Sequence, residues 1–288
     1  MDKVKKRKVD VLIISDIHLG TYGCHAKELL YYLRSIKPKK VILNGDIIDI
    51  WQFNKRYWPR SHTKIIRHIL GWITKGVKTY YVTGNHDEMV RKFAGFKMGS
   101  LQITNKVILD LDDGKKAWIF HGDVFDVTMQ HSKWLAKLGA VGYDTLILIN
   151  RFANFISEKV FKKGKLSLSK KIKHSVKSAL KYINDFEQTA ADIGIFQQYD
   201  FVICGHIHHP EMKTISNKQG AIQYLNSGDW IENLTALEYN DGAWSIYRFD
   251  NDRHNFKTTL VEPESELSNR ELFNDMLQEF NLMKASPQ

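Results

Sequence analysis

The chain is predicted to adopt an α/β fold, and three features of the sequence indicate it. Short apolar runs rich in β-branched and aromatic residues alternate with segments of helical periodicity. Each of the first runs leads directly into a polar block that contains glycine together with acidic, amide or imidazole side chains. The 288 residues, 43% of them hydrophobic, are enough to bury a sizeable core. We therefore expect alternating strands and helices, with functional loops at one edge of a sheet.

The expected elements follow one another in order along the chain. Strands that lead into polar blocks are predicted at 9–15, 40–44, 78–83, 117–120 and 200–204. Helices are predicted at 25–36 and 63–73, where apolar residues recur at helical spacing. Three later strands are predicted at 221–226, 234–239 and 243–249. These later strands are consistent with a second sheet that packs face to face on the first.

The five polar blocks collect metal-binding side chains. They are SDIHLG at 15–20, GDIIDIW at 45–51, GNHD at 84–87, HGD at 121–123 and GHIHH at 205–209. Carboxylate, imidazole and amide donors without thiolate suit manganese, iron or zinc. Two such ions about 3.5 to 4 Å apart can bind the attacking and leaving oxygens of a phosphoryl group and lower the pKa of a bridging water. The blocks supply enough ligands for two ions, and we predict a two-metal hydrolase site.

Two local features support this prediction. Each block contains or adjoins a glycine, which fits a tight turn where the backbone approaches a ligand closely. Asp16 and His18 are two residues apart, and in an extended segment they would point to the same side and share one ion.

The five blocks, in this order from Asp16 to His208, resemble those of the calcineurin-like metallophosphoesterases. The resemblance implies a four-layer α/β/β/α sandwich and two divalent ions, manganese first, with iron or zinc as alternatives. It also implies the metal ligands, which are Asp16, His18 and His208 for the first ion, Asn85, His121 and His206 for the second, and Asp46 as the bridge.

The same resemblance assigns a catalytic pair, His86 and Asp49. In the family the histidine of the GNHD block is not a ligand but faces the scissile phosphate, a role that suits a side chain whose pKa lies near working pH. Asp49 matches the position that hydrogen-bonds this imidazole and favours its charged form. Asp87 is expected to cap a turn. Asp123 fits either a turn or substrate binding, and it is kept as a candidate substrate-binding residue.

Positive charge is concentrated between the fourth and fifth blocks. The formal net charge is +10, and from Arg151 to Lys181 the single acid is Glu158. Apolar residues at helical spacing interleave with these lysines, as in a helix at a lipid interface. The preceding apolar stretch at 134–156 is interrupted by charges and is not a convincing membrane span. A phosphate-rich partner is expected to bind here.

This pattern predicts three parts. The phosphoesterase core would comprise 1–130 and 184–261, and a helical, basic insertion or cap would occupy 131–183. Residues 262–288 are expected to form a terminal helix and tail.

The insertion makes the chain similar to the UDP-2,3-diacylglucosamine diphosphatases of lipid A synthesis, as do the runs GDIIDIW, HGDVFD at 121–126 and SGDWIENLTALEY at 227–239. This resemblance implies attack of a metal-bridging hydroxide on a pyrophosphate, with release of UMP and a lipid-linked sugar phosphate. Lysines of the insertion would meet the headgroup, with Lys170, Lys173 and Lys177 as candidates. Many members of that branch have arginine where this chain has His86, which leaves the exact substrate open.

The expected partners are therefore a lipid-linked nucleotide sugar and the anionic surface of the inner membrane. A nuclease or other phosphodiesterase is the alternative, but the segment at 166–181 lacks the aromatic residues that stack on single strands, and nucleic acid is not expected. A non-catalytic scaffold would be expected to lose ligands, and none is missing.

Composition adds an expected location. Two cysteines give no disulfide framework, and the apolar stretch near the start is too short for a signal peptide. The protein is expected in the cytoplasm, peripheral at the inner membrane. The basic run KVKKRK at 3–8 is read as a solvated flank before the first strand rather than a nuclear signal. The oligomeric state is left open.

Overall fold

The structure, a computed structural model, describes residues 6–50, 57–125 and 170–252, with side chains from residue 181 onward in the last range. Its helices are α1 Ala26–Ser35, α2 Arg60–Thr74 and α4 Lys170–Phe196, and its short 3-10 helices are η1 Glu88–Phe93, η2 Asp123–Phe125 and η4 Phe249–Asp252. The predicted terminal helix at 262–288 and most of the predicted insertion at 131–183 lie outside the described residues.

The first sheet contains seven strands within the described ranges, in the order β12-β11-β1-β2-β3-β5-β4. Strands β1, β2, β3 and β5 run parallel to one another, whereas at the two edges β4 pairs antiparallel with β5, β11 with β1, and β12 with β11. The bounds are β1 Arg7–Ile14, β2 Ile36–Asn44, β3 Lys78–Val82, β4 Lys97–Met98, β5 Leu101–Thr104, β11 Thr235–Asn240 and β12 Ala243–Arg248.

The second sheet contains five described strands in the order β6-β7-β8-β10-β9. Strands β7, β8 and β10 are parallel, with β6 and β9 antiparallel at the edges. The bounds are β6 Val107–Asp110, β7 Lys116–Ile119, β8 Phe201–Cys204, β9 Glu211–Asn217 and β10 Gly220–Asn226.

The sequence suggested that all three late strands enter the second sheet, but only one of them does. β10 does, but β11 and β12 join the first sheet, where Val11, Leu12 and Ile13 of β1 pair with β11. The physical reason is burial. Five of the six residues of β11 are buried, so this strand needs cover on both faces, and its pairing also removes the exposed edge that β1 would otherwise present.

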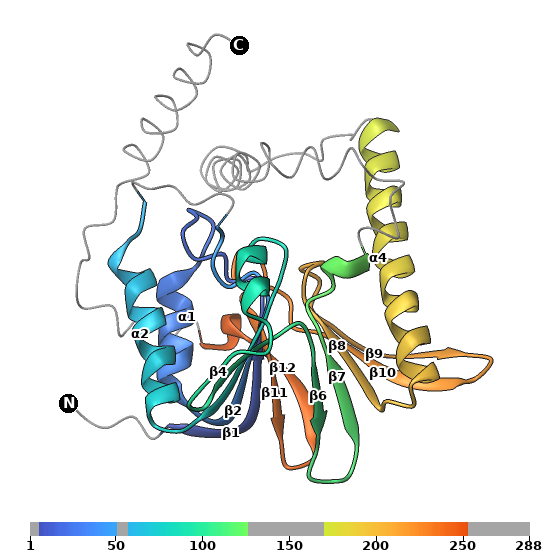
Figure 1. The fold of residues 1–288 in the computed structure, drawn as a ribbon. Helices are drawn as coiled ribbons and strands as arrows, with labels where there is room; N and C mark the ends of the chain where they lie inside the picture. The colour runs from blue at the N-terminus through green and yellow to red at the C-terminus, as the bar shows by residue number, and fades with distance from the viewer. Residues whose placement is uncertain (1–5, 51–56, 126–169, 253–288) are drawn as a thin grey trace. The chain divides into compact units, whose positions relative to one another are not determined.

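The layers follow the predicted α/β/β/α order. Helices α1 and α2 cover the outer face of the first sheet, and α4 covers the outer face of the second (Figure 1). Between the sheets lies an apolar core that includes Val11, Ile13 and Ile42 of the first sheet and Ile119 and Ile203 of the second. Burial of large apolar side chains such as these stabilises the fold by roughly 1.5 to 3 kcal/mol each.

A second apolar core joins α4 to the second sheet. Phe186 and Ala190 of α4 pack in one cluster with Val202, Cys204 and Tyr224. Cys204 is a buried free thiol inside this core, as predicted. Helix α4 runs without interruption past residue 183, where the boundary between insertion and core was predicted. No helix within the described ranges has the length and apolar character needed to cross a membrane.

The order of strands explains where the polar blocks meet. Three blocks follow β1, β2 and β3 of the first sheet, and two follow β7 and β8 of the second. Parallel strands place their carboxyl ends at one edge. The five blocks therefore come from both sheets and converge at one end of the inter-sheet core.

Candidate metal centre

Five of the predicted ligands share an uncommon backbone conformation. Asp16, His18, Asp46, His206 and His208 have φ angles between 51° and 67°, in the left-handed region that non-glycine residues rarely adopt. Such residues cost of order 1 kcal/mol or more each and cluster at functional sites. The segment after β1 is thus not extended, and the expectation that strand alternation brings Asp16 and His18 together is wrong. Turning of the loop brings them together instead.

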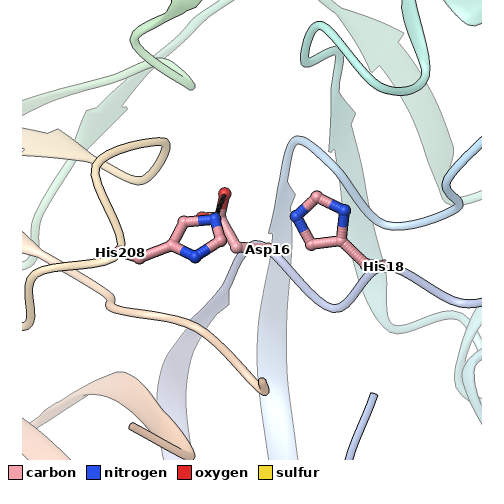
Figure 2. A group of neighbouring side chains, drawn as sticks. All are labelled: Asp16, His18 and His208. Atoms are coloured by element: carbon pink, nitrogen blue, oxygen red, sulfur yellow. Dashed lines mark ion pairs between the residues drawn. The ribbon is translucent and has the colours of Figure 1, made fainter. Parts of the chain in front are cut away.

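Asp16, in the loop after β1, contacts the loop after β8 of the other sheet. Its Oδ2 accepts a hydrogen bond from the backbone N–H of His206 at 3.1 Å, and its Oδ1 lies 3.1 Å from Nε2 of His208. Figure 2 shows Asp16 between His18 and His208, and one ligand atom from each of the three lies within 4.8 Å of the others. At Gly205 a Cβ would come within 2.6 Å of Asp16 Oδ2, so this approach requires glycine.

Asp46 has the same arrangement on the other side of the centre. Its Oδ1 accepts a hydrogen bond from the backbone N–H of His86 at 2.9 Å. Its Oδ2 lies 3.2 Å from Nε2 of His121 and 3.9 Å from Nε2 of His18. A Cβ at Gly84 would overlap the Asp46 carboxylate. One oxygen of each carboxylate is therefore fixed by the backbone while the other faces imidazole nitrogens.

Hydrogen bonds at Nδ1 select the nitrogen with which two histidines could bind an ion. His121 Nδ1 lies 2.9 Å from the carbonyl oxygen of Asn44, which accepts its hydrogen and leaves Nε2 as the ligand atom, 3.3 Å from Asn85 Oδ1. His18 Nδ1 lies 3.0 Å from Asp49 Oδ2, with the same consequence. Such outer contacts orient metal-binding histidines in proteins.

The residues present fit two divalent ions. Asp16, His18 and His208 form one group of ligand atoms within 4.8 Å of one another, and Asp46, His121 and His206 form another. Asn85 adds an amide oxygen beside the second group. Oxygen and imidazole nitrogen are ligands for manganese, iron and zinc alike, so the donor set does not choose between these ions.

His86 and Asp49 form the pair that the sequence predicted as catalytic. His86 Nδ1 lies 2.8 Å from Asp49 Oδ2, the same oxygen that contacts His18. Burial alone would lower the pKa of His86, but the hydrogen bond to Asp49 and the charge of Asp46 outweigh it, and the pKa is raised. Burial alone would raise the pKa of Asp49, but its contacts with His18 and His86 hold it well below its usual range. A third possible ligand group comprises His18, Asp46 and His86, so the position of His86 also permits metal binding.

Asp87 is placed as a structural residue, as expected. Its buried carboxylate accepts hydrogen bonds from the backbone N–H groups of Gly84 at 2.6 Å and Ile47 at 3.0 Å, and from the hydroxyl of Tyr81 at 2.6 Å. These contacts tie the GNHD turn to the loop after β2.

The candidate substrate-binding residues are placed only in part. Asp123 Oδ2 is 2.6 Å from Nη2 of Arg91, and this ion pair joins η2 to η1 beside the centre. Lys170, Lys173 and Lys177 lie in the first part of α4, whose side chains are outside the described residues. Their role stays a prediction.

Sequence reasoning missed the residues that support the GHIHH turn. Asn226 Nδ2 donates to the carbonyl of Gly205 at 2.9 Å, and Asn233 Nδ2 donates to the carbonyl of His208 at 2.8 Å. Asn233 also donates to the buried Asp229 at 2.6 Å. An acid at the start of a predicted turn, as in the SGDW run, is a turn signature, but the contacts of Asn226 and Asn233 with a distant loop are not visible locally.

Several known proteins are similar to this chain. The calcineurin-like phosphoesterase family model matches residues 9–210. A UDP-2,3-diacylglucosamine hydrolase of Aliivibrio fischeri is 24% identical over 243 residues, covering 83% of this chain and 98% of that protein. One from Vibrio cholerae serotype O1 is 26% identical over 238 residues, covering 79% of this chain and 93% of that protein. Among solved structures, the phosphoesterase YfcE from E. coli is 14% identical, with a TM-score of 0.39 and coverage of 84% and 93%.

Proposed function

The chain belongs to the calcineurin-like phosphoesterase family and is a hydrolase, and we propose that it cleaves the pyrophosphate of UDP-2,3-diacylglucosamine. The products would be UMP and a lipid-linked sugar phosphate. Support for the substrate comes from relatives of that activity, whose length this chain spans almost completely. Support for the chemistry comes from the site itself.

One observation carries the proposal. Asp46 belongs to the ligand group with His121 and His206, and its Oδ2 lies 3.2 Å from Nε2 of His121 and 3.9 Å from Nε2 of His18, a member of the other group. A carboxylate in that position can bridge two ions. Bound divalent ions, manganese in our proposal, would supply an activated water and offset charge on the phosphoryl group.

The protein's own side chains would then orient the proton donor and protonate a phosphate oxygen. Asp49 fixes His86 through Nδ1, which leaves Nε2 of the ring as the atom to donate a proton or hydrogen bond to a phosphate oxygen. The raised pKa of His86 favours the protonated ring that this role needs. Preorganised donors of this kind contribute most where negative charge grows in the transition state.

The remaining proposals concern the residues that would bind the substrate's headgroup and the membrane surface. Asp123, held by Arg91 near the centre, and the lysines at 170, 173 and 177 would contact the headgroup, and the basic insertion would meet an anionic membrane surface. These proposals rest on charge and on the relatives' substrate.

A hydrolysis assay with manganese tests the proposal. UDP-2,3-diacylglucosamine, an unacylated UDP-sugar and single-stranded DNA would be compared at equal concentration, with UMP or nucleotide release as the readout. We expect efficient cleavage of the lipid substrate only. Equal turnover of the unacylated sugar would show that the acyl chains are not recognised, and equal turnover of DNA would favour the nuclease alternative.

A further inference from the structure

A cavity of about 190 Å³ lies away from the metal centre, between the end of α1 and one face of α2. It is lined by Lys6, Arg34, Lys64, Arg67, His68, Gly71, Trp72 and Lys75. Lys6 precedes β1, Arg34 precedes β2 and Lys75 precedes β3, so the cavity is at the amino-terminal ends of these parallel strands. The metal-binding blocks follow the carboxyl ends of the same strands, at the opposite edge of the sheet.

The lining is built from one face of α2. Its five contributing residues, at 64, 67, 68, 71 and 72, are spaced at three and four residues and therefore share a side of the helix, and Lys75, the residue after the helix, continues this side. His68 Nε2 lies 3.1 Å from the carbonyl of Leu33, which fixes this face against α1. The ring of Trp72, which is 7% exposed, packs edge-on against His68 with centroids 4.9 Å apart.

Gly71 keeps the cavity open. A Cβ at this position would meet no atom within 4 Å, so a side chain there would project into empty space. Glycine inside a helix costs roughly 0.5 to 1 kcal/mol relative to alanine. Packing does not require glycine at this position. A ligand that occupies the cavity would explain why glycine is present there.

The cavity is strongly positive. Five of its eight lining residues are cations and none is an acid. Of these, Lys6, Arg34, Arg67 and Lys75 form no ion pair with any acid in the described part of the chain. Burial, followed by the charges of Lys6, Arg34 and Lys75, lowers the pKa of His68. Like charges gathered around a concave surface attract an anion and gain from its binding.

We propose that this cavity is a second binding site, which takes a phosphate group that carries at least two negative charges. Guanidinium groups bind phosphate through paired hydrogen bonds, and Arg34 and Arg67 stand on the two helices that border the cavity. A volume of about 190 Å³ has room for phosphate or pyrophosphate. The phosphate can belong to a free anion or to a lipid headgroup.

The site is independent of the proposed hydrolysis, and it gives the amino-terminal basic run a role that the sequence did not predict. Lys6 of that run lines the cavity rather than serving only as a solvated flank.

Calorimetric titration of the full chain with pyrophosphate tests the proposal. The titration is done in EDTA, so that ions at the metal centre do not bind the ligand. The double variant Arg34→Gln/Arg67→Gln is expected to bind pyrophosphate at least about tenfold more weakly than the wild type. Gly71→Leu keeps all five cations but fills the cavity, and it is expected to lose binding as well. The control Lys106→Gln/Lys218→Gln removes the same charge at exposed positions elsewhere and should bind as the wild type does.

Cosedimentation with vesicles that contain phosphatidic acid, whose phosphomonoester can carry two negative charges, separates the two sources of phosphate. Vesicle binding that both cavity variants lose and the control keeps, with no response to pyrophosphate, would assign the site to a lipid headgroup. The proposal fails if the cavity variants and the control bind equally in both assays, or if the wild type binds neither probe.

Discussion

Asp49 contacts both parts of the site, the predicted metal ligands and the predicted proton donor. A single oxygen, Oδ2, lies 3.0 Å from Nδ1 of His18 and 2.8 Å from Nδ1 of His86. One carboxylate thus orients a predicted metal ligand and the predicted proton donor. The low pKa of Asp49 keeps this oxygen charged at any working pH.

Asp49→Asn should therefore weaken both functions while keeping the side chain's shape. We expect turnover and manganese affinity each to fall roughly 10- to 100-fold, as for other residues that orient metal ligands. The measurements are steady-state hydrolysis and metal titration of the same preparation. Unchanged metal affinity would mean that the contact with His18 does not set the ligand's orientation.

His86→Ala separates proton donation from metal binding. We expect turnover to fall by roughly 10²- to 10⁴-fold, the usual contribution of a general acid, with both ions retained. Elemental analysis after gel filtration measures the retained metal. Loss of one ion would instead assign His86 to the ligand group that it forms with His18 and Asp46.

At the scale of elements, His62 joins α2 to the loop that carries His18. The buried His62 ring accepts a hydrogen bond from the backbone N–H of Gly20 through Nδ1 at 3.0 Å. Burial lowers the pKa of His62 to about 4, because the protonated ring would be desolvated. In the unfolded chain the pKa returns to about 6.5.

This pKa difference predicts a pH dependence of stability. Above pH 6.5 the ring is neutral in both states and the full stability is present. As the pH falls from 6.5 to 4 the unfolded chain binds the proton first, so stability is lost over that window and not below it. The variant His62→Gln can still accept the hydrogen bond from Gly20. In EDTA, its free energy of unfolding should fall between pH 7 and pH 4.5 by about 2 kcal/mol less than that of the wild type. Equal losses in urea titrations at the two pH values would contradict the assignment.

Some of the secondary-structure elements could be predicted from the sequence and others could not. The strands before the five blocks, the helices α1 and α2 and the layered fold were predictable, because periodicity and turn residues are local signals. The left-handed backbone at Asp16 and His18 was not, since tertiary contacts impose it. The entry of β11 into the first sheet was missed for the same reason, because the choice of a partner strand depends on which edge needs cover.

The site residues divide in the same way. Ligand types and their order along the chain indicated the groups around Asp16 and Asp46. The sharing of Asp49 by two histidines, the pair Arg91–Asp123 and the support of His208 by Asn233 join residues distant in sequence. No local pattern specifies such contacts.

The candidate metal centre joins the two sheets. Its groups come from loops after β1, β2 and β3 of one sheet and β7 and β8 of the other. Without ions, Asp16, Asp46 and the buried Asp49 bring negative charges close together at the end of the core. Ions that bind only the folded arrangement stabilise it by mass action.

Removal of metal should accordingly destabilise the folded chain without unfolding it, because the cores on both sides of the second sheet are apolar and need no metal. At a manganese concentration of about 100 times Kd, the gain over the EDTA-treated chain should be about 2.7 kcal/mol per independent site. For a chain of this size that corresponds to a rise in Tm of several degrees. Differential scanning calorimetry with and without manganese measures it. Asp46→Asn, which changes a carboxylate that contacts histidines of both ligand groups, should abolish most of the rise. An equal rise in that variant would show that the ions stabilise the fold from somewhere other than this centre.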